Sequence, residues 1–507
     1  MNNMIYFTRV FIYILISLAI VKGQIILQDH DHDHEVNPVY PQDSNDQYNL
    51  LHHLGGVGPY HKSTGFGLDI ETPYKYEVDK VFILSRHGER FPTTRVGNEL
   101  LKTYRKLQKQ YKKLLYINPN FQINDSNNDN PLTFIQDSKF FLSYEKSEDL
   151  FEMITNSGSY SGVSDMFKLG REIKEKYGYL YDNSTGELPI FSAGEQRVVD
   201  SAKSLANGFF SDSEYNAKIH VIPERKRQGL NTLSSYRSCP KAFIKRYNSK
   251  LVKTFKKSYI ETETDKINEI NYPFFKINSK DTLNLLHYCA FELNINGNSS
   301  ICNKFSREVF NEFEYTRDLE LWYSKGPGYH LSELMGSIYV NASLTLMEGE
   351  EEEDSGDKGT LNNKIWISLT HDTDLIFFLT SLGLFDNQED LNLKEIQFSR
   401  FFKTSEMVPM GGRIVLERIV VSETSMKEHK DDKDTKYLRL KINDSVIPIP
   451  NCQEGPGYSC SIKKLRELIN KKSISNVDYV KVCKIKSHKP QYLSFYWDYK
   501  DNDYSLE

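Results

Sequence analysis

The sequence predicts an α/β fold in which a mostly parallel sheet is flanked by helices. Two runs of mainly apolar residues carry this prediction: residues 81–84 (Val-Phe-Ile-Leu) and residues 365–370 (Ile-Trp-Ile-Ser-Leu-Thr). Neither run alternates polar and apolar residues, so both are typical of strands buried on both faces. The first leads into a motif that contains His87, and the second leads into His371. Because such sheets bind ligands beyond the carboxyl ends of their strands, we expect one shared crevice for both histidines.

The motif after the first run is the most specific signal in the chain. Residues 86–92 read Arg-His-Gly-Glu-Arg-Phe-Pro and match the pattern Arg-His-Gly-x-Arg-x-Pro. Here the sequence resembles the histidine acid phosphatases, whereas an Arg-His or His-Asp pair alone is more often an ordinary solvated loop. The resemblance covers about residue 54 to Cys483. Within the family, the sequence most resembles the phosphate-repressible secreted acid phosphatases of yeasts. It implies a phosphoglycerate-mutase-like sheet with a smaller α-helical insertion as a cap.

The resemblance also implies roles for six residues. His87 would attack phosphorus and form a phosphohistidine, and Asp372 would protonate the departing oxygen. Asp372 must then hold a proton before reaction, and a carboxyl with an ordinary pKa near about 4 favours acidic pH. The phosphoryl oxygens would be bound by the remaining four, Arg86, Arg90, Arg197 and His371. No metal and no cofactor are expected, because guanidinium groups would neutralise the developing charge.

Arg197 is also unusual on physical grounds. A short apolar strand at residues 188–191 turns through small residues into a helix, which places Arg197 in the first helical turn. A cation there opposes the helix dipole, and an anion near that terminus would resolve the conflict. An ion pair with Glu195 or Asp200 is the structural alternative.

Helical periodicity accounts for much of the remaining chain. Apolar residues recur every three or four positions across residues 97–116 and 164–177, which predicts amphipathic helices whose apolar faces are core. A further helix is expected at residues 331–347. We expect this organisation: a signal peptide at 1–23, a polar, disordered leader at 24–53, an α/β catalytic domain at 54–241 and 340–507, and a mainly α-helical cap at 242–339.

The N-terminus and the cysteines both indicate export. Residues 10–21 form an apolar run that suits a secretory signal peptide and is short of the roughly 20 residues of a membrane span. An uncleaved anchor is the alternative. The six cysteines allow fifteen pairings, and short loops favour two of them, which leaves a long-range third. The resemblance implies the same set: Cys289–Cys302, Cys452–Cys460 and Cys239–Cys483.

Surface features are consistent with a secreted protein. Residues 29–35 alternate aspartate and histidine; such a tract can hold a transition metal, but a solvated leader is the preferred interpretation. The net charge of -5 and the lack of a dense basic run argue against a nucleic-acid partner. In an exported chain the Asn-x-Ser/Thr sequons are candidate glycosylation sites. They lie at Asn124, Asn183, Asn298, Asn341 and Asn443.

The favoured function is a secreted acid phosphatase that scavenges phosphate from small-molecule monoesters in the periplasmic space, cell wall or medium, with no membrane contact after signal cleavage. A phytase of the same fold is the nearest alternative, but residues 242–339 show no dense basic lining for a polyphosphorylated substrate. An inactive cell-wall binding protein is a third possibility. Phosphoglycerate mutases also use a histidine after Arg-His-Gly, but the export signal and disulfides speak against them. Monomer and homo-oligomer both remain open.

Overall fold

The structure is a computed structural model, and from Leu50 onward the chain forms one compact unit. Among the described residues, no helix has the length and hydropathy needed to cross a membrane. The expected signal peptide, the Asp/His tract and Asn183 lie outside the described residues. The structure describes residues 49–181, 188–210, 217–224, 228–239, 249–349, 363–422, 435–472, 479–485, 490–502 and 504.

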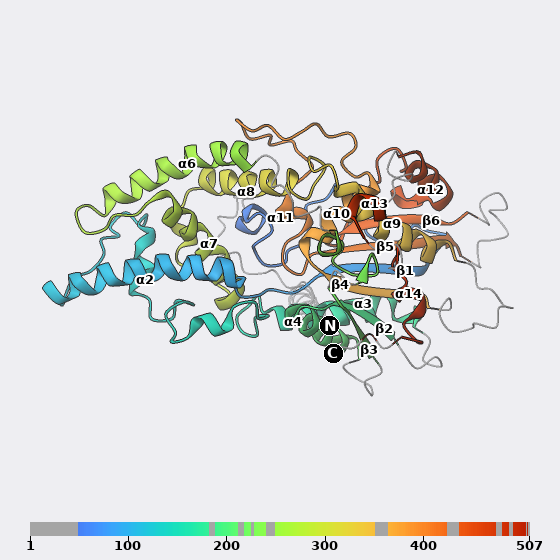
Figure 1. Cartoon of the computed structure of the whole chain (residues 1–507), viewed down its shortest axis with the longest axis horizontal. Helices are drawn as coiled ribbons and strands as arrows, with labels where there is room; N and C mark the ends of the chain where they lie inside the picture. The colour runs from blue at the N-terminus through green and yellow to red at the C-terminus, as the bar shows by residue number, and fades with distance from the viewer. Residues whose placement is uncertain are drawn as a thin grey trace, which may run out of the picture. The chain divides into compact units, whose positions relative to one another are not determined.

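A mixed sheet forms the centre of the fold (Figure 1). Its strand order is β3-β2-β4-β1-β5-β6-β7, with β8 beside β6. The four strands from β3 to β1 are parallel, whereas β5 to β8 pair antiparallel. The predicted α/β class is confirmed, with an antiparallel extension on its parallel core. The strands are β1 (Tyr76–Arg86), β2 (Leu188–Ala193), β3 (Ala217–Ile222), β4 (Ile365–Thr370), β5 (Arg413–Val421), β6 (Tyr437–Ile442), β7 (Ser445–Val446) and β8 (Cys460–Ser461).

The two apolar runs of the sequence are neighbouring parallel strands. β1 and β4 are in register from Val81 opposite Ile365 to Arg86 opposite Thr370. Every residue of β4 is buried, as expected for a central strand covered on both faces. Because the strands end side by side, the residues that follow them lie at one edge of the sheet.

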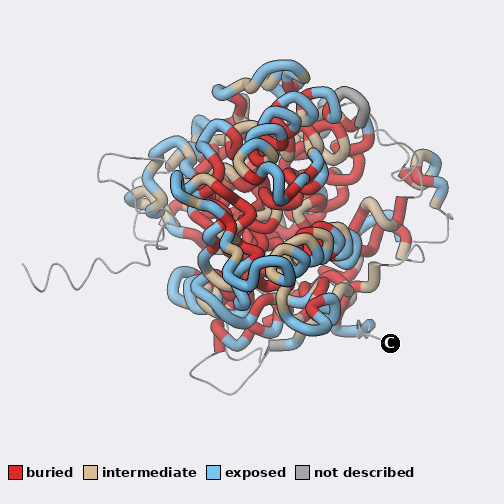
Figure 2. Tube along the Cα trace, turned by 90° about the vertical axis from the view of Figure 1, so that its left-hand side faces the viewer, coloured by how far each residue is buried: buried red, intermediate tan, exposed pale blue. Residues whose placement is uncertain are grey.

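Helices cover both faces of the sheet, with α3 and α4 on one side and α9 and α10 on the other (Figure 1). Alternate residues of β1 show the two interfaces. Phe82 stacks on Phe378 of α10, while Ile83 lines a cavity together with Leu169 and Ile173 of α3. The buried trace in Figure 2 accordingly runs through the interior of the molecule. These helices are α3 (Gly162–Tyr177), α4 (Gln196–Phe209), α9 (Ser332–Glu348) and α10 (Asp372–Leu382).

A second group of helices packs together beside the sheet (Figure 1): α2 (Thr94–Ile117), α6 (Ser249–Ile270), α7 (Ser279–Asn296) and α8 (Arg307–Trp322). Asn278 begins α7 with a capping box. The hydroxyl of Tyr288 on α7 donates to the carbonyl of Leu100 on α2 at 2.6 Å. The helical part therefore includes α2, which precedes residues 242–339 in the sequence.

The remaining helices are short, apart from α12. They are η1 (Leu50–His53), η2 (Pro131–Gln136), η3 (Ser147–Leu150), η4 (Gly178–Leu180), α5 (Ser235–Ser238), η7 (Cys302–Lys304), α11 (Thr404–Met407), η9 (Pro456–Tyr458), α12 (Ile462–Lys471), α13 (Tyr479–Cys483) and α14 (Phe495–Asp498).

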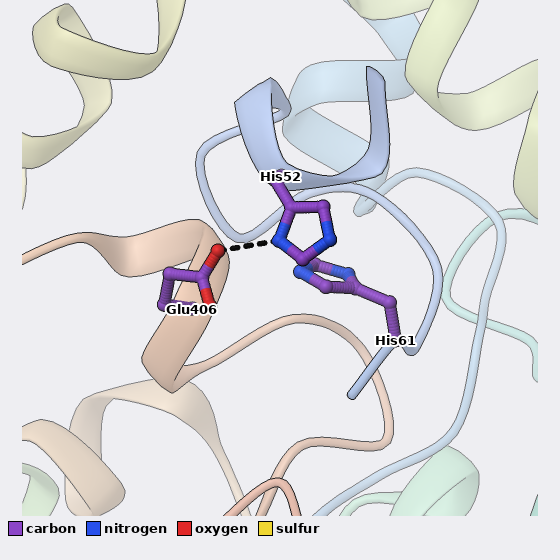
Figure 3. Close-up of side chains that lie close together, drawn as sticks. All are labelled: His52, His61 and Glu406. Atoms are coloured by element: carbon purple, nitrogen blue, oxygen red, sulfur yellow. Dashed lines mark hydrogen bonds and ion pairs between the residues drawn. The ribbon is translucent and has the colours of Figure 1, made fainter. Parts of the chain in front are cut away.

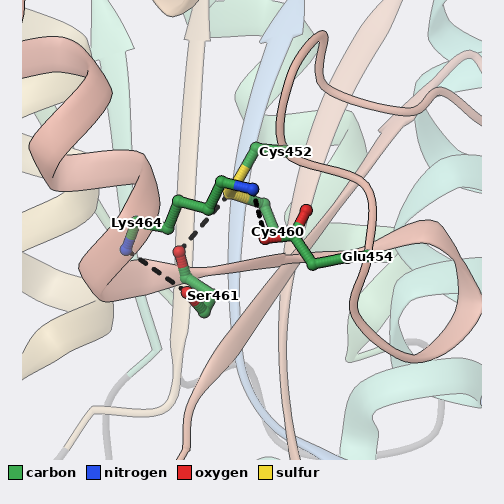
Figure 4. Close-up of a disulfide and its surroundings, with 5 residues drawn as sticks. All are labelled: Cys452, Glu454, Cys460, Ser461 and Lys464. Carbon is green, nitrogen blue, oxygen red and sulfur yellow. Dashed lines mark hydrogen bonds and ion pairs between the residues drawn. A yellow bond between two sulfur atoms is a disulfide. The ribbon is translucent and has the colours of Figure 1, made fainter.

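The structure contains all three expected disulfides, Cys239–Cys483, Cys289–Cys302 and Cys452–Cys460. The first joins residues 244 positions apart and ties α13 to the end of α5. The third closes the loop before α12, where Glu454 and Lys464 form an ion pair at 2.5 Å (Figure 4). The long-range bridge constrains the unfolded chain most in a chain-entropy description.

The sequons differ in exposure. Asn124, Asn298 and Asn341 are exposed and stay candidate glycosylation sites. Asn443 is 0% exposed, in the turn between β6 and β7. Its side-chain nitrogen donates to the carbonyl of Glu406 at 2.7 Å, and its side-chain oxygen accepts from the backbone N–H of Arg413 at 2.7 Å. The expectation for Asn443 is therefore wrong, because the amide that would carry the glycan is buried and bonded.

Candidate active site

His87 follows β1 directly and is 2% exposed. Its backbone is held on both sides, since its N–H donates to the carbonyl of Thr370 at 3.1 Å and its carbonyl accepts from Gly411 at 2.9 Å. Nδ1 lies 2.8 Å from the carbonyl of Gly88. A carbonyl can only accept, so Nδ1 carries the proton and Nε2 keeps a free lone pair. Nε2 is therefore the ring atom whose lone pair can act as a base or a nucleophile.

The surroundings keep this ring neutral. Burial lowers the pKa of His87 well below its usual 6.5, and the positive charges of Arg197, Arg86 and Arg90 lower it further. His371 acts in the same direction, and the two imidazole centroids are 5.9 Å apart. The residues that the sequence predicted to converge on His87 are therefore brought together.

Arg86 is fixed by backbone groups from distant segments. One terminal nitrogen donates to the carbonyls of Gly56 and Val408, each at 2.6 Å. The other lies 3.1 Å from a carboxylate oxygen of Asp372. Arg90 donates to the carbonyl of Phe91 at 2.8 Å. These bonds hold the two guanidinium groups in place without neutralising both of them.

One donor of each guanidinium has no partner in the free site. The Nε–H groups of Arg86, Arg90 and Arg197 are buried and have no hydrogen-bond partner among the residues that the structure describes. Burial lowers the pKa of Arg90 to about 9, and the neighbouring charges of Arg197 and Arg86 lower it further. Mutual repulsion and unused donors both favour binding of a multivalent anion such as phosphate.

Arg197 occupies the first turn of α4, as predicted. It forms ion pairs with Glu152, at 2.8 Å, and with Glu195. Arg197 thus pairs with Glu195, as the structural alternative expected, and also lies close enough to His87 to lower its pKa. Asp200 does not pair with Arg197 but accepts a hydrogen bond from Gln196. The two carboxylates compensate Arg197 in the free protein and orient it.

His371 is held by a buried glutamate. Its Nε2 lies 2.8 Å from an oxygen of Glu224, which follows β3. Burial alone would raise the pKa of Glu224, but the hydrogen bond and the charge of His371 lower it below the usual 4.5. Glu224 is therefore a carboxylate that accepts a hydrogen bond from Nε2–H of His371 and holds this imidazole beside that of His87.

Asp372 begins α10 and accepts from the backbone N–H of Thr373 at 2.7 Å. Burial alone would raise its pKa, but the charges of Arg86 and His371 outweigh burial and hold the pKa below the usual 3.8. In the free site Asp372 is thus ionised, whereas an acid catalyst must carry a proton. The expected acid form requires a change in the surrounding charge, which a bound phosphate dianion would supply.

Several of these contacts gave no signal in the sequence. Glu152 and Glu224 lie in separate loops without a recognisable motif, and Ser201 lies inside α4. The hydroxyl of Ser201 accepts from the backbone N–H of Gly88 at 3.0 Å. Gly88 leaves no room for a side chain, because a Cβ there would lie 2.8 Å from the carbonyl of Gly162. Such partners can be found only from spatial proximity.

Two further cations near Asp372 come from residues 242–339. Arg317 on α8 lowers the pKa of Asp372, and burial lowers the pKa of Lys325 while Asp374 and Asp372 raise it. The sequence revealed no basic lining in this segment, but the fold brings these two charges within electrostatic range of the site.

Glu195, Glu224 and His371 have the spacing of a metal site, with ligand atoms within 4.8 Å of one another. Both carboxylates are already paired with arginines, Glu195 with Arg197 and Arg237, and Glu224 with Arg237 at 3.5 Å. This group is therefore an ion-pair network that holds Arg197 and His371 in place.

The geometry agrees with the comparisons with known proteins. The family model of the histidine phosphatase superfamily (branch 2) matches residues 77–443. The chain belongs to this family. This histidine phosphatase is 36% identical to an acid phosphatase of Komagataella pastoris, over 90% of this chain and 92% of the relative. It is 33% identical to a phytase of Candida albicans, over 92% of this chain and 93% of the relative.

A solved structure extends the family assignment to the fold. The crystal structure of the phytase from D. castellii superposes with a TM-score of 0.79 at 29% identity, covering 91% of this chain and 93% of that chain. The histidine phosphatase sheet and its flanking helices are thus shared along almost the whole described length.

Proposed function

We propose that this histidine phosphatase is a secreted acid phosphatase that hydrolyses phosphate monoesters through a phosphohistidine at acidic pH and so scavenges phosphate. The observation that carries the proposal is the neutral Nε2 of His87 within a cluster of arginines whose Nε–H groups are buried and unused. A neutral imidazole is an unusual feature in an acidic medium. Here burial and positive charge preserve the lone pair that the reaction needs.

The first chemical step is displacement at phosphorus. Arg86, Arg90 and Arg197 bind the phosphoryl oxygens and neutralise charge as it develops. Nε2 of His87 forms a bond to phosphorus while the bond from phosphorus to the ester oxygen breaks. Nδ1 keeps its proton and donates a hydrogen bond to the carbonyl of Gly88. This hydrogen bond stabilises the positively charged ring that forms.

Asp372 supplies the proton that the leaving oxygen needs. The phosphate dianion takes over Arg86, whose charge holds the pKa of Asp372 low in the free site. With that charge compensated, Asp372 accepts a proton from an acidic medium and passes it to the departing alkoxide. Its carboxylate then takes a proton from the attacking water, whose oxygen bonds to phosphorus while the bond from phosphorus to Nε2 breaks. This step releases inorganic phosphate and regenerates neutral His87.

Export and an acidic setting fit other features. Three disulfides are typical of oxidising compartments outside the cytosol. The relatives include a repressible acid phosphatase of Saccharomyces cerevisiae at 30% identity, over 90% of this chain and 92% of the relative. Repressible synthesis would suit a scavenging enzyme.

Phytase activity is the second candidate. Two relatives at similar identity are phytases, and Arg317 and Lys325 add positive charge beside Asp372. An inositol carrying several phosphates would use such charges outside the position of the reacting phosphate. We favour the broad phosphatase because the described cations beyond the motif are few and partly paired, as Arg317 is with Glu320 at 2.6 Å.

The test compares wild type with His87→Ala on p-nitrophenyl phosphate and on inositol hexakisphosphate at acidic pH. His87→Ala is expected to abolish turnover of both substrates, and an alkaline quench of wild type that is turning over a radiolabelled ester should trap a phosphohistidine, whose P–N bond is stable in base. A higher kcat/KM for p-nitrophenyl phosphate supports the broad phosphatase, and a higher value for inositol hexakisphosphate supports the phytase. Wild type without activity on any monoester would instead indicate the inactive binding protein.

A further inference from the structure

Three metal-ligating side chains gather in a part of the fold that the phosphatase reaction does not use. His52 lies in η1, His61 lies in the segment that follows, and Glu406 lies in α11 (Figure 3). One ligand atom of each lies within 4.8 Å of the others. Glu406 is more than 340 residues away from either histidine, so the fold itself assembles the group.

His61 has an unused nitrogen inside this group. The residue is 6% exposed, and its Nδ1 faces the carbonyl of Pro59 at 3.3 Å, which assigns the proton to Nδ1. Nε2 is buried and has no hydrogen-bond partner in the described part of the chain. Figure 3 shows the two imidazole rings against each other, with ring nitrogens facing the Glu406 carboxylate. A buried lone pair without a donor is unfavourable unless it has a ligand.

The other two side chains are already in contact and remain accessible. Nδ1 of His52 lies 2.5 Å from an oxygen of Glu406, and the ring centroids of His52 and His61 are 4.3 Å apart. The side chains of His52 and Glu406 are 25% and 15% exposed, which leaves one side open to solvent. A cation could take the place of the hydrogen in the bond between His52 and Glu406.

Surrounding groups orient the carboxylate. The second oxygen of Glu406 accepts from the hydroxyl of Ser63 at 3.1 Å and from the backbone N–H of Thr64 at 2.7 Å. Carbonyls bonded to a ligating histidine and donors bonded to a ligating carboxylate are typical of the second shell of metal sites. Both kinds of support are present here before any ion is bound.

We propose that His52, His61 and Glu406 bind a divalent transition-metal ion of the zinc class. Two imidazoles and one carboxylate suit zinc, whose tetrahedral ligand atoms lie about 3.4 Å apart. Small side-chain rotations close the group to that spacing, and water from the open side completes the coordination. Cations that require only oxygen ligands are disfavoured by the two nitrogens.

The position of the site suggests a structural role. Gly56 follows η1 and Val408 follows α11, and their carbonyls hold the guanidinium of Arg86. An ion bound by His52 and Glu406 would cross-link η1 to α11, and therefore the two segments that support Arg86. The site is expected to stabilise the folded protein and takes no part in the phosphoryl transfer.

The test uses Co²⁺ as a spectroscopic probe on the full secreted chain. The Asp/His leader also contains possible ligands, so the reference protein carries His30→Ala, His32→Ala and His34→Ala. We expect one equivalent of Co²⁺ to produce the intense visible absorption of tetrahedral coordination and Zn²⁺ to displace it. Zn²⁺ should also raise the midpoint of thermal unfolding by at least about 2 °C.

Substitutions in the same background identify the ligands. His61→Asn and Glu406→Gln should each weaken Co²⁺ binding by on the order of 100-fold or more and abolish the thermal shift. The matched control is His53→Asn, which removes the neighbouring histidine that bonds to Glu314 at 3.1 Å instead. This control should bind Co²⁺ like the reference protein.

Two results would overturn the proposal. One is a reference protein that gives neither the tetrahedral Co²⁺ spectrum nor a thermal shift. The other is His61→Asn and Glu406→Gln proteins that keep the spectrum of the reference. Thermal unfolding without metal shows whether each variant is folded, so loss of binding is read only from folded variants.

Discussion

His87 combines two properties at the scale of a single residue. Its Nδ1 is committed to the carbonyl of Gly88, and its surroundings lower its pKa well below 6.5. An ordinary histidine would be protonated in the acidic medium where Asp372 can hold a proton. In the proposed mechanism the cluster of arginines therefore has two effects: it binds the anion, and it keeps the nucleophile neutral before the anion arrives.

Asp372→Asn tests the assignment of the acid. For alkyl phosphates, whose leaving oxygen is strongly basic, we expect kcat to fall by about 10²–10⁴-fold. For p-nitrophenyl phosphate the loss should be much smaller, since its leaving oxygen needs little protonation. Steady-state kinetics with both ester types measures the difference. Equal losses for the two types would reject Asp372 as the acid.

At the scale of elements, close helix packing positions the site. α3 and α4 approach backbone to backbone, because a Cβ on Gly208 would lie 1.9 Å from the carbonyl of Phe167, and one on Gly170 would lie 2.0 Å from the carbonyl of Leu205. α4 carries Arg197 and Ser201, so the spacing of these helices sets the position of both side chains beside the end of β1.

Gly208→Ala should force α3 and α4 apart. We expect a loss of about 1–3 kcal/mol in the free energy of unfolding, because backbone atoms cannot move aside as a side chain can. Urea unfolding measures this loss. The control is Gly178→Ala, where the nearest atom to a Cβ is a flexible Lys174 carbon at 3.4 Å and the backbone is right-handed helical. Equal stability of the two variants would contradict the packing argument.

At the scale of the whole molecule, buried carboxyls make the folded protein more stable at mildly acidic pH than at neutral pH. Burial raises the pKa of Glu292 from 4.5 to about 7 and that of Asp374 from 3.8 to about 6. In the unfolded chain both groups ionise near their usual pKa. Between about pH 4 and pH 7 the folded state therefore binds more protons than the unfolded state, and stability falls as pH rises.

A different group limits stability at the acid end. Burial alone would raise the pKa of Glu417, but the positive charges of Lys441 and Arg439 hold it at about 2. The folded pKa is below the unfolded value, so the stabilisation from Glu417 is present above about pH 4.5 and is lost as pH falls toward 2. Together, the pKa values of Glu292, Asp374 and Glu417 predict that the folded protein is most stable at mildly acidic pH.

The thermal midpoint of unfolding should accordingly be higher at about pH 5 than at about pH 7.5. Glu292→Gln should reduce this difference, because an amide accepts the same hydrogen bond from Ser299 but does not ionise. Thermal scans over that pH range provide the measurement, with exposed Glu269→Gln as control. A Glu292→Gln protein with an unchanged pH slope would show that Glu292 does not carry the effect.

Several features could be predicted because they arise from patterns among neighbouring residues. The apolar runs identified β1 and β4, helical periodicity identified α2 and α3, and loop length identified the Cys289–Cys302 and Cys452–Cys460 disulfides. The motif around His87 and the His371-Asp372 pair identified the residues that meet at the site. These predictions succeeded because side-chain periodicity, short-loop closure and strand ends are encoded in neighbouring residues.

Features that depend on residues far apart in the sequence became visible only in the three-dimensional structure. It placed Glu224 against His371 and the carbonyls of Gly56 and Val408 against Arg86. It placed positive charges near Asp372, which keep this residue ionised in the free site, and it buried the sequon at Asn443. Burial and electrostatic energy are sums over spatial neighbours, so the same side chain has a different pKa or accessibility in each fold. The chemistry of this site therefore depends on which groups the fold places around each side chain.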